Sequence, residues 1–374
     1  MKALEWCVRG IITALIIAGC GTERKKENFE KEFTYGGLRA STADNGSREA
    51  PFEPPIGMVW IPGGKFLQGA VAHDKMAMAH EMPAHLVKVD GFFMDSNEVT
   101  NEEFGKFVEE TGYVTTAERQ LEWEELKKQL PQGTPRPHDS LMQPGSLTFK
   151  KTPTSVPNLY DFSQWWRWTI GASWKHPHGP GSFITGKENY PVVHITYEDA
   201  LAYCEWAGRR LPTEAEWELA ARGENLDKIY SWGDDLGKLK QHANTWEGEF
   251  PVSNSKTDGY ERLAPVKSYP PNNNGLYDMA GNVWEWTSDW YNTNYYNELT
   301  KHPGLIENPN GAMKPFNRNN PYAREKVIKG GSFLCSASYC ASYRVSARMA
   351  TSLDSSLEHV GFRTVATVEM LEDK

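Results

Sequence analysis

The chain has 374 residues, of which 39% are hydrophobic and 12% aromatic, so it can bury a sizeable core and is not disordered as a whole. Its net charge of −9, without a concentrated run of basic residues, excludes a nucleic-acid-binding role, because phosphate recognition needs a basic face. The 14 tryptophans, 32 glycines and 23 prolines indicate an irregular, loop-rich fold packed around large rings.

The first twenty residues are typical of an export signal rather than of a folded domain. Lys2 and Arg9 precede a short apolar run that ends in IAGC, which resembles the lipobox of bacterial lipoproteins. In that motif the cysteine becomes the lipidated N-terminus after cleavage, and the alternatives are an ordinary secretory signal or a buried apolar strand. We expect residues 1–20 to be a lipoprotein signal peptide and Cys20 to carry lipid. Gly21 gives no cue for retention at the inner membrane, so the expected location is the outer membrane of a bacterial envelope.

Export changes the cysteine count of the folded protein. Cys7 would leave with the signal peptide and Cys20 would carry lipid, so the folded part would keep Cys204, Cys335 and Cys340. Disulfides persist in an exported protein, and an odd number of thiols leaves at least one of them unpaired.

Residues 21–55 are polar and charged, and we expect a flexible tether there, followed by one folded domain over residues 56–366 and a short tail over 367–374. The domain begins with MVWIPGGKFLQG (58–69), which predicts a strand, a Pro-Gly-Gly turn and a second strand. The stretch HLVKVDGFFMDSNEVT (85–100) alternates in the manner of a strand.

Three capping boxes predict helices. In each of them a threonine is followed three positions later by an acidic residue, as in Thr100 with Glu103, Thr196 with Asp199, and Thr213 with Glu216. The expected helices cover residues 101–112, 200–210 and 214–223. The second of them carries Cys204, whose expected role is that of a buried apolar thiol.

The remaining segments give weaker signals. Residues 118–160 are charged and rich in proline, and we expect a surface excursion there. After residue 230 the sequence has little helical or strand periodicity. There is no internal repeat and no break in composition, so one domain of about 310 residues fits best.

Two loops are rich in side-chain oxygens. Hard cations such as Ca²⁺ collect carboxylate, amide and backbone oxygens from flexible loops. From spacing alone, solvated loop acids and turn-forming residues are favoured over a metal site. The first loop, over residues 242–266, contains Asn244, Glu247, Glu249 and Asp258, and the second, over 277–290, contains Asp278, Asn282, Glu285 and Asp289.

Cys335 and Cys340 lie close together in KGGSFLCSASYCASYRVSARM. A disulfide across so short a loop would be a weak stabiliser, because it removes little unfolded-state entropy. Two thiolates could instead form a redox site or bind a soft ion, and Cu(I) accepts two sulfur ligands where Zn²⁺ requires four ligands. Unpaired thiols are the third alternative, and the residues alone leave all three open.

Six stretches resemble, in order and without a missing block, the formylglycine-generating enzyme (sulfatase-modifying factor) family. GNVWEWTSDW and RLPTEAEWE are shared with a wider superfamily that includes ergothioneine-type enzymes and non-catalytic lectin-like proteins, so they indicate the fold more than the activity. The C-x4-C pair after GGS is more specific, since relatives without the oxidase activity generally lack it. The six are MVWIPGGKFLQG, VDGFFMDSNEVTNEEFGKFVEETGY, WWRWTIGASWKHPHGPGS, PVVHITYEDALAYCEWAGRRLPTEAEWELAARG, GLYDMAGNVWEWTSDW, and KGGSFLCSASYCASYRVSARM followed by GFRTV.

The resemblance implies an α+β fold related to C-type lectins, loop-rich and with sparse secondary structure. It also implies an aerobic copper oxidase that uses O₂ to convert the cysteine of a C-x-P-x-R motif in an unfolded sulfatase to Cα-formylglycine. The catalytic positions would be Cys335 and Cys340, which hold Cu(I), and Ser332, which helps to organise the oxygen pocket. Trp284 and Tyr339 match aromatic residues that line this pocket and the groove for the substrate peptide.

The resemblance further implies a calcium ion in each of the two oxygen-rich loops. Asp278 stands where an asparagine is common in the family, a change that keeps an oxygen ligand. The first calcium would be held by Asn244, Thr245 (backbone), Asp258 and Tyr260 (backbone), and the second by Asp278, Gly281 (backbone), Val283 (backbone) and Glu285.

The sequence departs from its animal relatives at their disulfides. Cys204 matches one half-cystine, but its partner position is Thr364, and the other bridge has Ala221 and Val345, so packing and calcium must replace both bridges. The alternative function is a non-catalytic, lectin-like envelope lipoprotein that binds a surface ligand or partner, and a third is an oxidase acting on another thiol. In each case we expect a monomer that meets the membrane through its N-terminal lipid.

Overall fold

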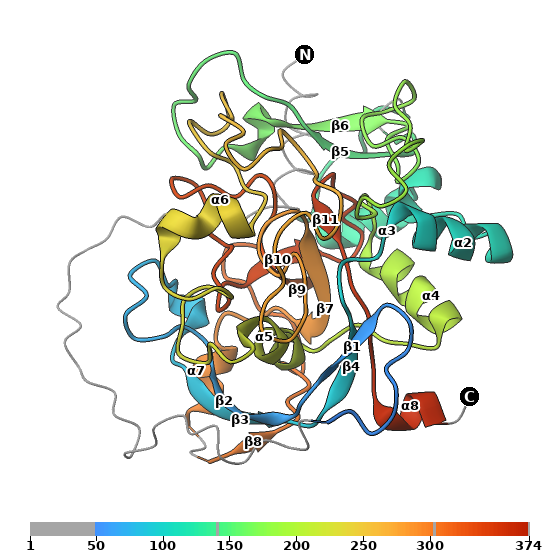
Figure 1. Cartoon of the computed structure of the whole chain (residues 1–374). Helices are drawn as coiled ribbons and strands as arrows, with labels where there is room; N and C mark the ends of the chain where they lie inside the picture. Colours follow the sequence, from blue (N-terminus) through green and yellow to red (C-terminus); the bar gives the residue numbers. More distant parts are fainter. Residues whose placement is uncertain (1–48, 140–141, 302–303, 373–374) are drawn as a thin grey trace.

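The computed structural model describes residues 49–139, 142–301 and 304–372 (Figure 1). The predicted signal peptide, Cys20 and most of the predicted tether lie outside these described residues. Packing already begins at the end of that tether, where the ring of Phe52 stacks on that of Phe93 with centroids 5.0 Å apart. Across the described ranges, none of the helices combines the length and the apolar character needed to span a bilayer.

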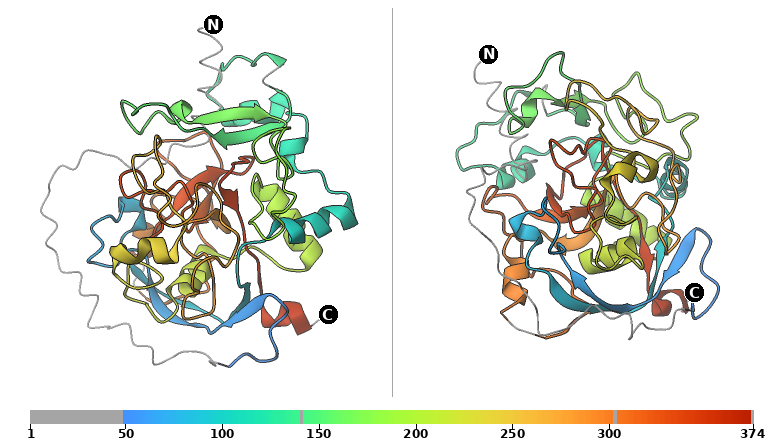
Figure 2. Two further views of the ribbon diagram at one scale, coloured as in Figure 1. Left: turned by 45° about the horizontal axis from the view of Figure 1, so that its top comes forward. Right: turned by 60° about the vertical axis from the view of Figure 1, so that its left-hand side comes forward.

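The N-terminal strands form two small sheets at one end of the molecule (Figures 1 and 2). One has the order β1–β4–β12 and the other β2–β3–β8. The predicted strand, turn and second strand are present, but β1 and β2 do not pair with each other. Gly63 and Gly91 lie so close that a Cβ on Gly63 would be 2.6 Å from the Gly91 nitrogen, so the chain crosses over at this point. The strands are β1 (Met58–Ile61), β2 (Gly64–Gln68), β3 (His85–Val89), β4 (Phe92–Asp95), β8 (Ile306–Glu307) and β12 (Val365–Ala366).

A four-stranded sheet of order β10–β9–β7–β11 occupies the middle of the molecule. The weak periodicity after residue 230 therefore did not indicate these strands. The strand β9 is buried on both faces, so it shows no alternation, and its charged residues are buried as well. The four are β7 (Trp284–Trp290), β9 (Glu325–Lys329), β10 (Met349–Ser352) and β11 (Val360–Gly361).

The segment predicted as a surface excursion contains half of an antiparallel hairpin. β5 (Gly145–Phe149) is buried along its whole length and pairs with β6 (Trp166–Ile170), which lies after the excursion. A surface excursion was therefore the wrong prediction for residues 145–149. The sequence GSLTF alternates polar and apolar residues but is only five residues long, and its serine and threonine are buried through hydrogen bonds rather than exposed.

The three capped helices are confirmed as α2 (Asn101–Thr111), α4 (Tyr197–Ala207) and α5 (Glu214–Arg222), each with a reciprocal capping box at the predicted threonine. The helix α4 starts before its predicted residue 200 and ends before 210, because Gly208 closes it in the left-handed conformation. The other helices are short: α3 (Trp123–Leu126), α6 (Leu239–His242), α7 (Tyr295–Leu299) and α8 (Val368–Glu372). The 3₁₀ turns are Ala79–Glu81, Thr116–Glu118, Lys127–Gln129, Phe162–Gln164 and Leu236–Lys238.

A large aromatic core connects these elements. Trp165 and Trp286 are fully buried in it, and so is the Cys204 side chain on α4, as predicted for an apolar thiol. The helix α8 packs on a smaller cluster with Phe93, although residues 367–374 were expected to be a tail. The result is an α+β fold with sparse secondary structure, in which long loops are held by rings and buried polar contacts.

Candidate active site

The cysteine loop, residues 330–343, joins β9 to the segment that enters β10. It opens with Gly330 and Gly331, whose φ angles are 90° and 77°. A Cβ on Gly331 would lie 3.0 Å from the backbone carbonyl carbon and oxygen of Ser342. The two ends of the loop therefore pack backbone against backbone, which requires glycine at this position.

Two successive turns place Cys335 and Cys340 side by side. The backbone N–H of Cys335 donates to the Ser332 carbonyl at 2.9 Å, and that of Cys340 donates to the Ser336 carbonyl at 3.0 Å. Both side chains are reduced thiols, with Cys335 buried and Cys340 partly exposed. Burial, and then the hydrogen-bonded Cys335 thiol, raises the pKa of Cys340 well above its usual value. Neutral thiols so placed lose their protons when a metal ion binds.

Ser332 contacts a histidine that sequence reasoning missed. Its Oγ lies 3.3 Å from Nδ1 of His359 and accepts the backbone N–H of Leu334. Burial lowers the pKa of His359 to about 3, so the imidazole is neutral at physiological pH. The ring of His359 meets that of Trp166 edge to face at 4.8 Å. No local pattern signals His359, because it comes from the segment just before β11.

The two predicted aromatic residues, Trp284 and Tyr339, have different neighbours. Trp284 is buried at the start of β7, and its backbone N–H donates to the His359 carbonyl at 2.9 Å. Tyr339 lies between the two cysteines in sequence and stacks on Phe250, with ring centroids 4.5 Å apart and planes 3° apart. The structure thus brings Ser332 and Trp284 together around His359 and places Tyr339 beside an aromatic wall.

The first predicted calcium loop has unsatisfied oxygens. The Oδ1 of Asn244 is buried without a hydrogen-bond donor, and so is the Thr245 hydroxyl. The Asp258 carboxylate accepts the backbone N–H groups of Thr245 and Tyr260, at 2.8 Å and 3.0 Å. All four predicted ligands therefore belong to one hydrogen-bonded loop, and the orphaned amide oxygen fits a hard cation.

The second predicted calcium loop contains an additional carboxylate, Glu98. The Oε2 of Glu98 and the Oδ1 of Asp278 are both buried without a donor. Burial raises the pKa of Asp278 to about 6, and burial followed by Asp278 raises the pKa of Glu98 well above its usual value. Glu285 is instead bound by the Arg363 guanidinium through two hydrogen bonds of 2.7 Å. The unmatched oxygens at this site therefore belong to Asp278 and Glu98.

The donor sets in both loops mix side chains with backbone. Over the three described ranges, no three acidic, histidine or cysteine side chains converge as a metal site on their own. A cation at either loop would need the predicted backbone carbonyls of Thr245 and Tyr260, or of Gly281 and Val283. Such mixed oxygen sets suit Ca²⁺ better than metals that prefer nitrogen or sulfur.

Asn282 connects the two calcium loops to the cysteine loop. Its side chain accepts the backbone N–H of Ala264 and donates to Glu98, and Asn244 donates to it at 3.1 Å. Its carbonyl accepts the backbone N–H of Phe333, directly after Ser332. Disorder in either oxygen-rich loop would therefore be transmitted to the residue next to the active-site serine.

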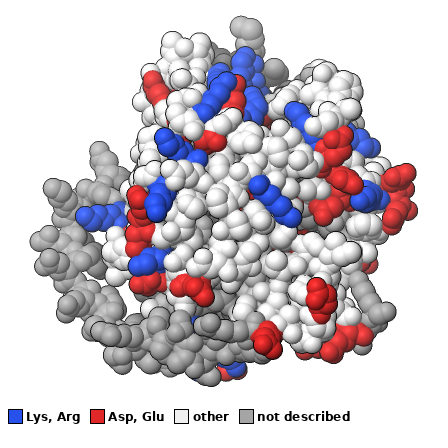
Figure 3. Space-filling model, in the orientation of Figure 1, with Lys and Arg blue, Asp and Glu red and all other residues white. Residues whose placement is uncertain are grey.

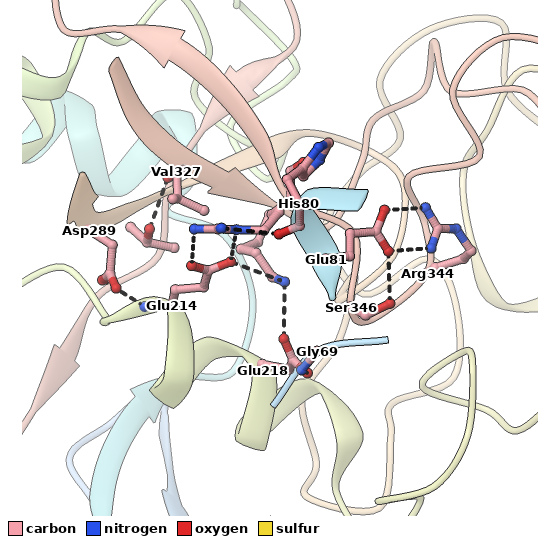
Figure 4. A network of polar contacts seen from close by, with 12 residues as sticks. Gly69, His80, Glu81, Glu214, Glu218, Asp289, Val327, Arg344 and Ser346 are labelled. Carbon is pink, nitrogen blue, oxygen red and sulfur yellow. Dashed lines mark hydrogen bonds and ion pairs between the residues drawn. The ribbon is translucent and has the colours of Figure 1, made fainter. Parts of the chain in front are cut away.

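Buried ion pairs hold both ends of the cysteine loop (Figure 4). On the incoming side, Lys329 lies 3.3 Å from Glu218 and 3.8 Å from Glu214. On the outgoing side, Arg344 donates to both oxygens of Glu81, at 2.6 Å and 2.7 Å. All of these groups are essentially inaccessible to solvent. The loop is thus anchored by charges that cannot be rehydrated without opening the core.

The surface shows no comparable concentration of charge on the face seen in Figure 3, where acidic and basic side chains are interspersed around a broad uncharged area.

The loop-rich α+β fold and the two apposed thiols are features of one class of protein. Similarity to known proteins shows which class this is. The sulfatase-modifying factor enzyme 1-like domain matches residues 44–368, and the chain belongs to this formylglycine-generating enzyme family. It is similar to the formylglycine-generating enzyme of Bos taurus, at 40% identity over 94% of this chain and 86% of that one. It is 41% identical to that of Thermomonospora curvata, over 85% and 96%.

One further relative and one solved structure are similar to this chain. The inactive Cα-formylglycine-generating enzyme 2 of Mus musculus is 36% identical, over 83% of this chain and 85% of that one. The solved structure of PvdO from Pseudomonas aeruginosa matches with a TM-score of 0.55 at 22% identity, over 83% and 94%. The second likeness confirms the predicted fold class alone.

Proposed function

We propose that this protein is a copper-dependent oxidase that converts the cysteine of a C-x-P-x-R motif in sulfatases to Cα-formylglycine. The observation that carries the proposal is the apposed, reduced pair of Cys335 and Cys340. The chain that contains this pair is 40% and 41% identical to the two formylglycine-generating enzymes named above. Because an inactive relative shares the fold, family membership alone does not support catalysis. The buried thiol pair does support catalysis, because a protein that only binds a ligand does not need it.

The thiol pair fits a soft, monovalent metal ion. Cys335 and Cys340 would hold Cu(I) as thiolates, and no histidine or third cysteine completes a zinc set among the described residues. Bound copper would supply a one-electron route between sulfur and O₂, which side chains do not offer. The raised pKa of Cys340 in the metal-free chain keeps its sulfur protonated until the metal replaces that proton.

The surrounding residues position the reactants. The Ser332 hydroxyl, held by the neutral His359 ring and the Leu334 N–H, would present a hydrogen-bonding group to oxygen next to the thiols. Trp284 excludes water from that side, being buried against the same segment. Cys340 is the more exposed of the two cysteines and adjoins Tyr339, so the substrate cysteine would approach along the aromatic wall that contains Phe250.

The proposal is tested by mass spectrometry of a C-x-P-x-R peptide incubated with the Cu(I)-loaded protein in air. The expected product has lost the thiol and gained an aldehyde, which an aldehyde-reactive probe labels. A matched peptide with serine in place of cysteine should stay unchanged. An unmodified cysteine peptide, with the protein folded and copper bound, would contradict the proposal.

His359→Ala is expected to lower peptide turnover by about tenfold to a hundredfold, as for other residues that orient an active-site group through a hydrogen bond. The reason is that Ser332 loses the imidazole that fixes its hydroxyl. His359→Asn, which keeps a polar group near Ser332, should recover part of the loss. Cu(I) affinity, measured by competition with a chromogenic chelator, should not change in either variant. A parallel fall in Cu(I) affinity would show that His359 acts on the metal site instead.

We also propose that the two oxygen-rich loops bind structural Ca²⁺. Removal of the ion with EGTA should lower the melting temperature, because Ca²⁺ at about 100 times its Kd adds about 2.7 kcal/mol to the free energy of unfolding. Asp258→Ala should weaken this response and Asp227→Ala, at an exposed loop acid, should not. Calorimetry in EGTA, Ca²⁺ and Mg²⁺ measures the effect. Identical unfolding curves in EGTA and Ca²⁺ would refute structural calcium.

We further propose that Cys20 anchors the protein to the bacterial envelope through lipid, on the strength of the IAGC motif. Cys20→Ala should shift the protein from the membrane fraction to the soluble fraction and abolish incorporation of a labelled fatty acid. Cell fractionation with Cys7→Ala as the matched control measures both. Labelling of the Cys20→Ala protein would contradict the assignment.

A further inference from the structure

A row of aromatic rings leads away from the cysteine loop, starting at Tyr343. Tyr343, within that loop, lies with its ring centroid 6.0 Å from that of Tyr230. Tyr230 stacks on Trp232 at 4.8 Å with ring planes 7° apart, and Trp232 stacks on His242 at 5.2 Å with planes 8° apart. The centroids of all neighbouring rings in the row are thus within 6.0 Å.

Backbone hydrogen bonds fix the segments that carry the rings of this row. The backbone N–H of Val345 donates to the Ile229 carbonyl at 2.9 Å, which fixes the segment before Tyr230 against the exit of the cysteine loop. Tyr230 and Gly233 exchange two backbone hydrogen bonds, at 2.9 Å and 3.1 Å, and close a tight turn. The indole N–H of Trp232 donates to the Asp235 carbonyl, which sets the plane of the ring.

The row runs from the thiols to solvent. Tyr343 and Tyr230 are buried, whereas Trp232 and His242 are partly exposed. Tyr343 lies three positions after Cys340, and a Cβ on Gly331 would be 3.0 Å from its backbone nitrogen. The next residue, Ser332, donates its backbone N–H to the Cys335 sulfur at 3.4 Å, so the row starts beside the thiols. The wall on the Tyr339 side is different, because the rings packed on Tyr339, those of Phe162, Trp165 and Phe250, are all buried and do not lead to solvent.

We propose that Tyr343, Tyr230 and Trp232 form a one-electron transfer path between the Cys335–Cys340 pair and the surface. Tyrosine and tryptophan rings can lose and regain one electron, whereas phenylalanine rings cannot at biological potentials. Stacked rings shorten each transfer, and the rate falls steeply with distance. The path would let a one-electron reductant of the enediol class, such as ascorbate, act at Trp232 without entering the site.

The need for electrons follows from the proposed function, on which this inference rests. Oxidation of the substrate cysteine, R–CH₂–SH, to the thioaldehyde R–CHS releases two electrons and two protons. Reduction of O₂ to two H₂O takes up four electrons and four protons. Two electrons and two protons must therefore be supplied in each turnover, and the thioaldehyde then exchanges sulfur with water to give the aldehyde and H₂S. In the proposed function the substrate peptide would approach along the Tyr339 wall, so a reductant would act on the separate row that starts at Tyr343.

The path can be tested on the metal-free protein without any peptide. A ruthenium tris-bipyridine photo-oxidant with an irreversible cobalt(III) acceptor withdraws electrons at exposed tryptophan. With the path intact, two withdrawals oxidise Cys335–SH and Cys340–SH to a disulfide and release two protons. Mass spectrometry after alkylation measures the disulfide, and transient absorption measures the lifetime of the tryptophan radical.

Tyr230→Phe keeps the ring and its packing and is expected to lose the light-dependent disulfide and to lengthen the lifetime of the radical at Trp232. Trp232→Phe should lose the disulfide as well. Trp206→Phe is the matched control, because Trp206 on α4 is also accessible to solvent, and its ring packs on Phe107 and Tyr203 rather than on the row. An undiminished disulfide yield in Tyr230→Phe, or an equal loss in Trp206→Phe, would overturn the path. Neither result bears on peptide oxidation, so the proposed function is judged separately.

Discussion

Replacing either Cys335 or Cys340 by serine is expected to abolish Cu(I) binding and peptide oxidation together. Serine fills nearly the same volume, but its hydroxyl is a hard, protonated ligand that does not hold Cu(I). The remaining thiol is a single ligand in a site without a third cysteine or a histidine set among the described residues. The loss should therefore be complete in each single variant, and the double variant should be no worse.

Cys204→Ser provides the matched control for this experiment. Cys204 is also a buried thiol, on α4, and burial raises its pKa as it does that of Cys340. The Cys204 variant should keep Cu(I) affinity and turnover, even if its melting temperature falls. An anaerobic titration with a Cu(I) chelator and the peptide assay give the two readouts. Full turnover in Cys335→Ser would exclude the two-thiolate site.

The parts of the fold that the sequence predicts are those with local causes. The capping boxes at Thr100, Thr196 and Thr213 each act within four residues, so the starts of α2, α4 and α5 follow from the sequence. The pairing of β1 with β4 is different, because it depends on how two glycine turns cross, and a local hairpin looks equally good. The strand β9 gives no periodic signal, since both of its faces are buried.

The candidate site divides in the same way. Ser332, Tyr339 and the two cysteines lie within nine positions of one another in one loop, so a motif can identify them together. His359 reaches Ser332 only because β11 pairs with β7 in parallel, with Val360 opposite Trp284. Glu98 reaches Asp278 across 180 positions of sequence. When two residues of a site are this far apart in the sequence, no motif spacing indicates that they lie together.

The buried charges explain how a loop without regular structure can hold two thiols in place. Glu214 accepts Arg348 through two hydrogen bonds of 2.7 Å, and Lys329 lies beside it, so one carboxylate links β9 to the entry of β10. In Figure 4 the Glu214 side chain lies on the left, Glu218 lies below it, and Glu81 with Arg344 lies on the right. The cysteine loop begins after Lys329 and ends before Arg344. Its geometry therefore depends on compensated charge rather than on a disulfide.

Glu214→Gln is consequently expected to reduce the free energy of unfolding by about 3–5 kcal/mol, the usual cost of leaving a buried charge without its partner. Arg348 and Lys329 would keep their positive charges without the Glu214 carboxylate, at zero side-chain exposure. Because both cations flank the cysteine loop, Cu(I) affinity should fall as well. Urea unfolding followed by tryptophan fluorescence, and the chelator competition, measure the two effects.

The matched control is Glu198→Gln, which removes a carboxylate from an exposed pair with Arg119. Such surface pairs contribute about 0–1 kcal/mol, so this variant should unfold almost as the parent does. If Glu214→Gln does not accumulate as folded protein, the double variant Glu214→Gln with Arg348→Gln removes both members of the pair and should recover part of the stability. Equal losses in Glu214→Gln and Glu198→Gln would mean that the buried charges do not hold the loop, and that the packing of Gly331 against Ser342 is sufficient on its own.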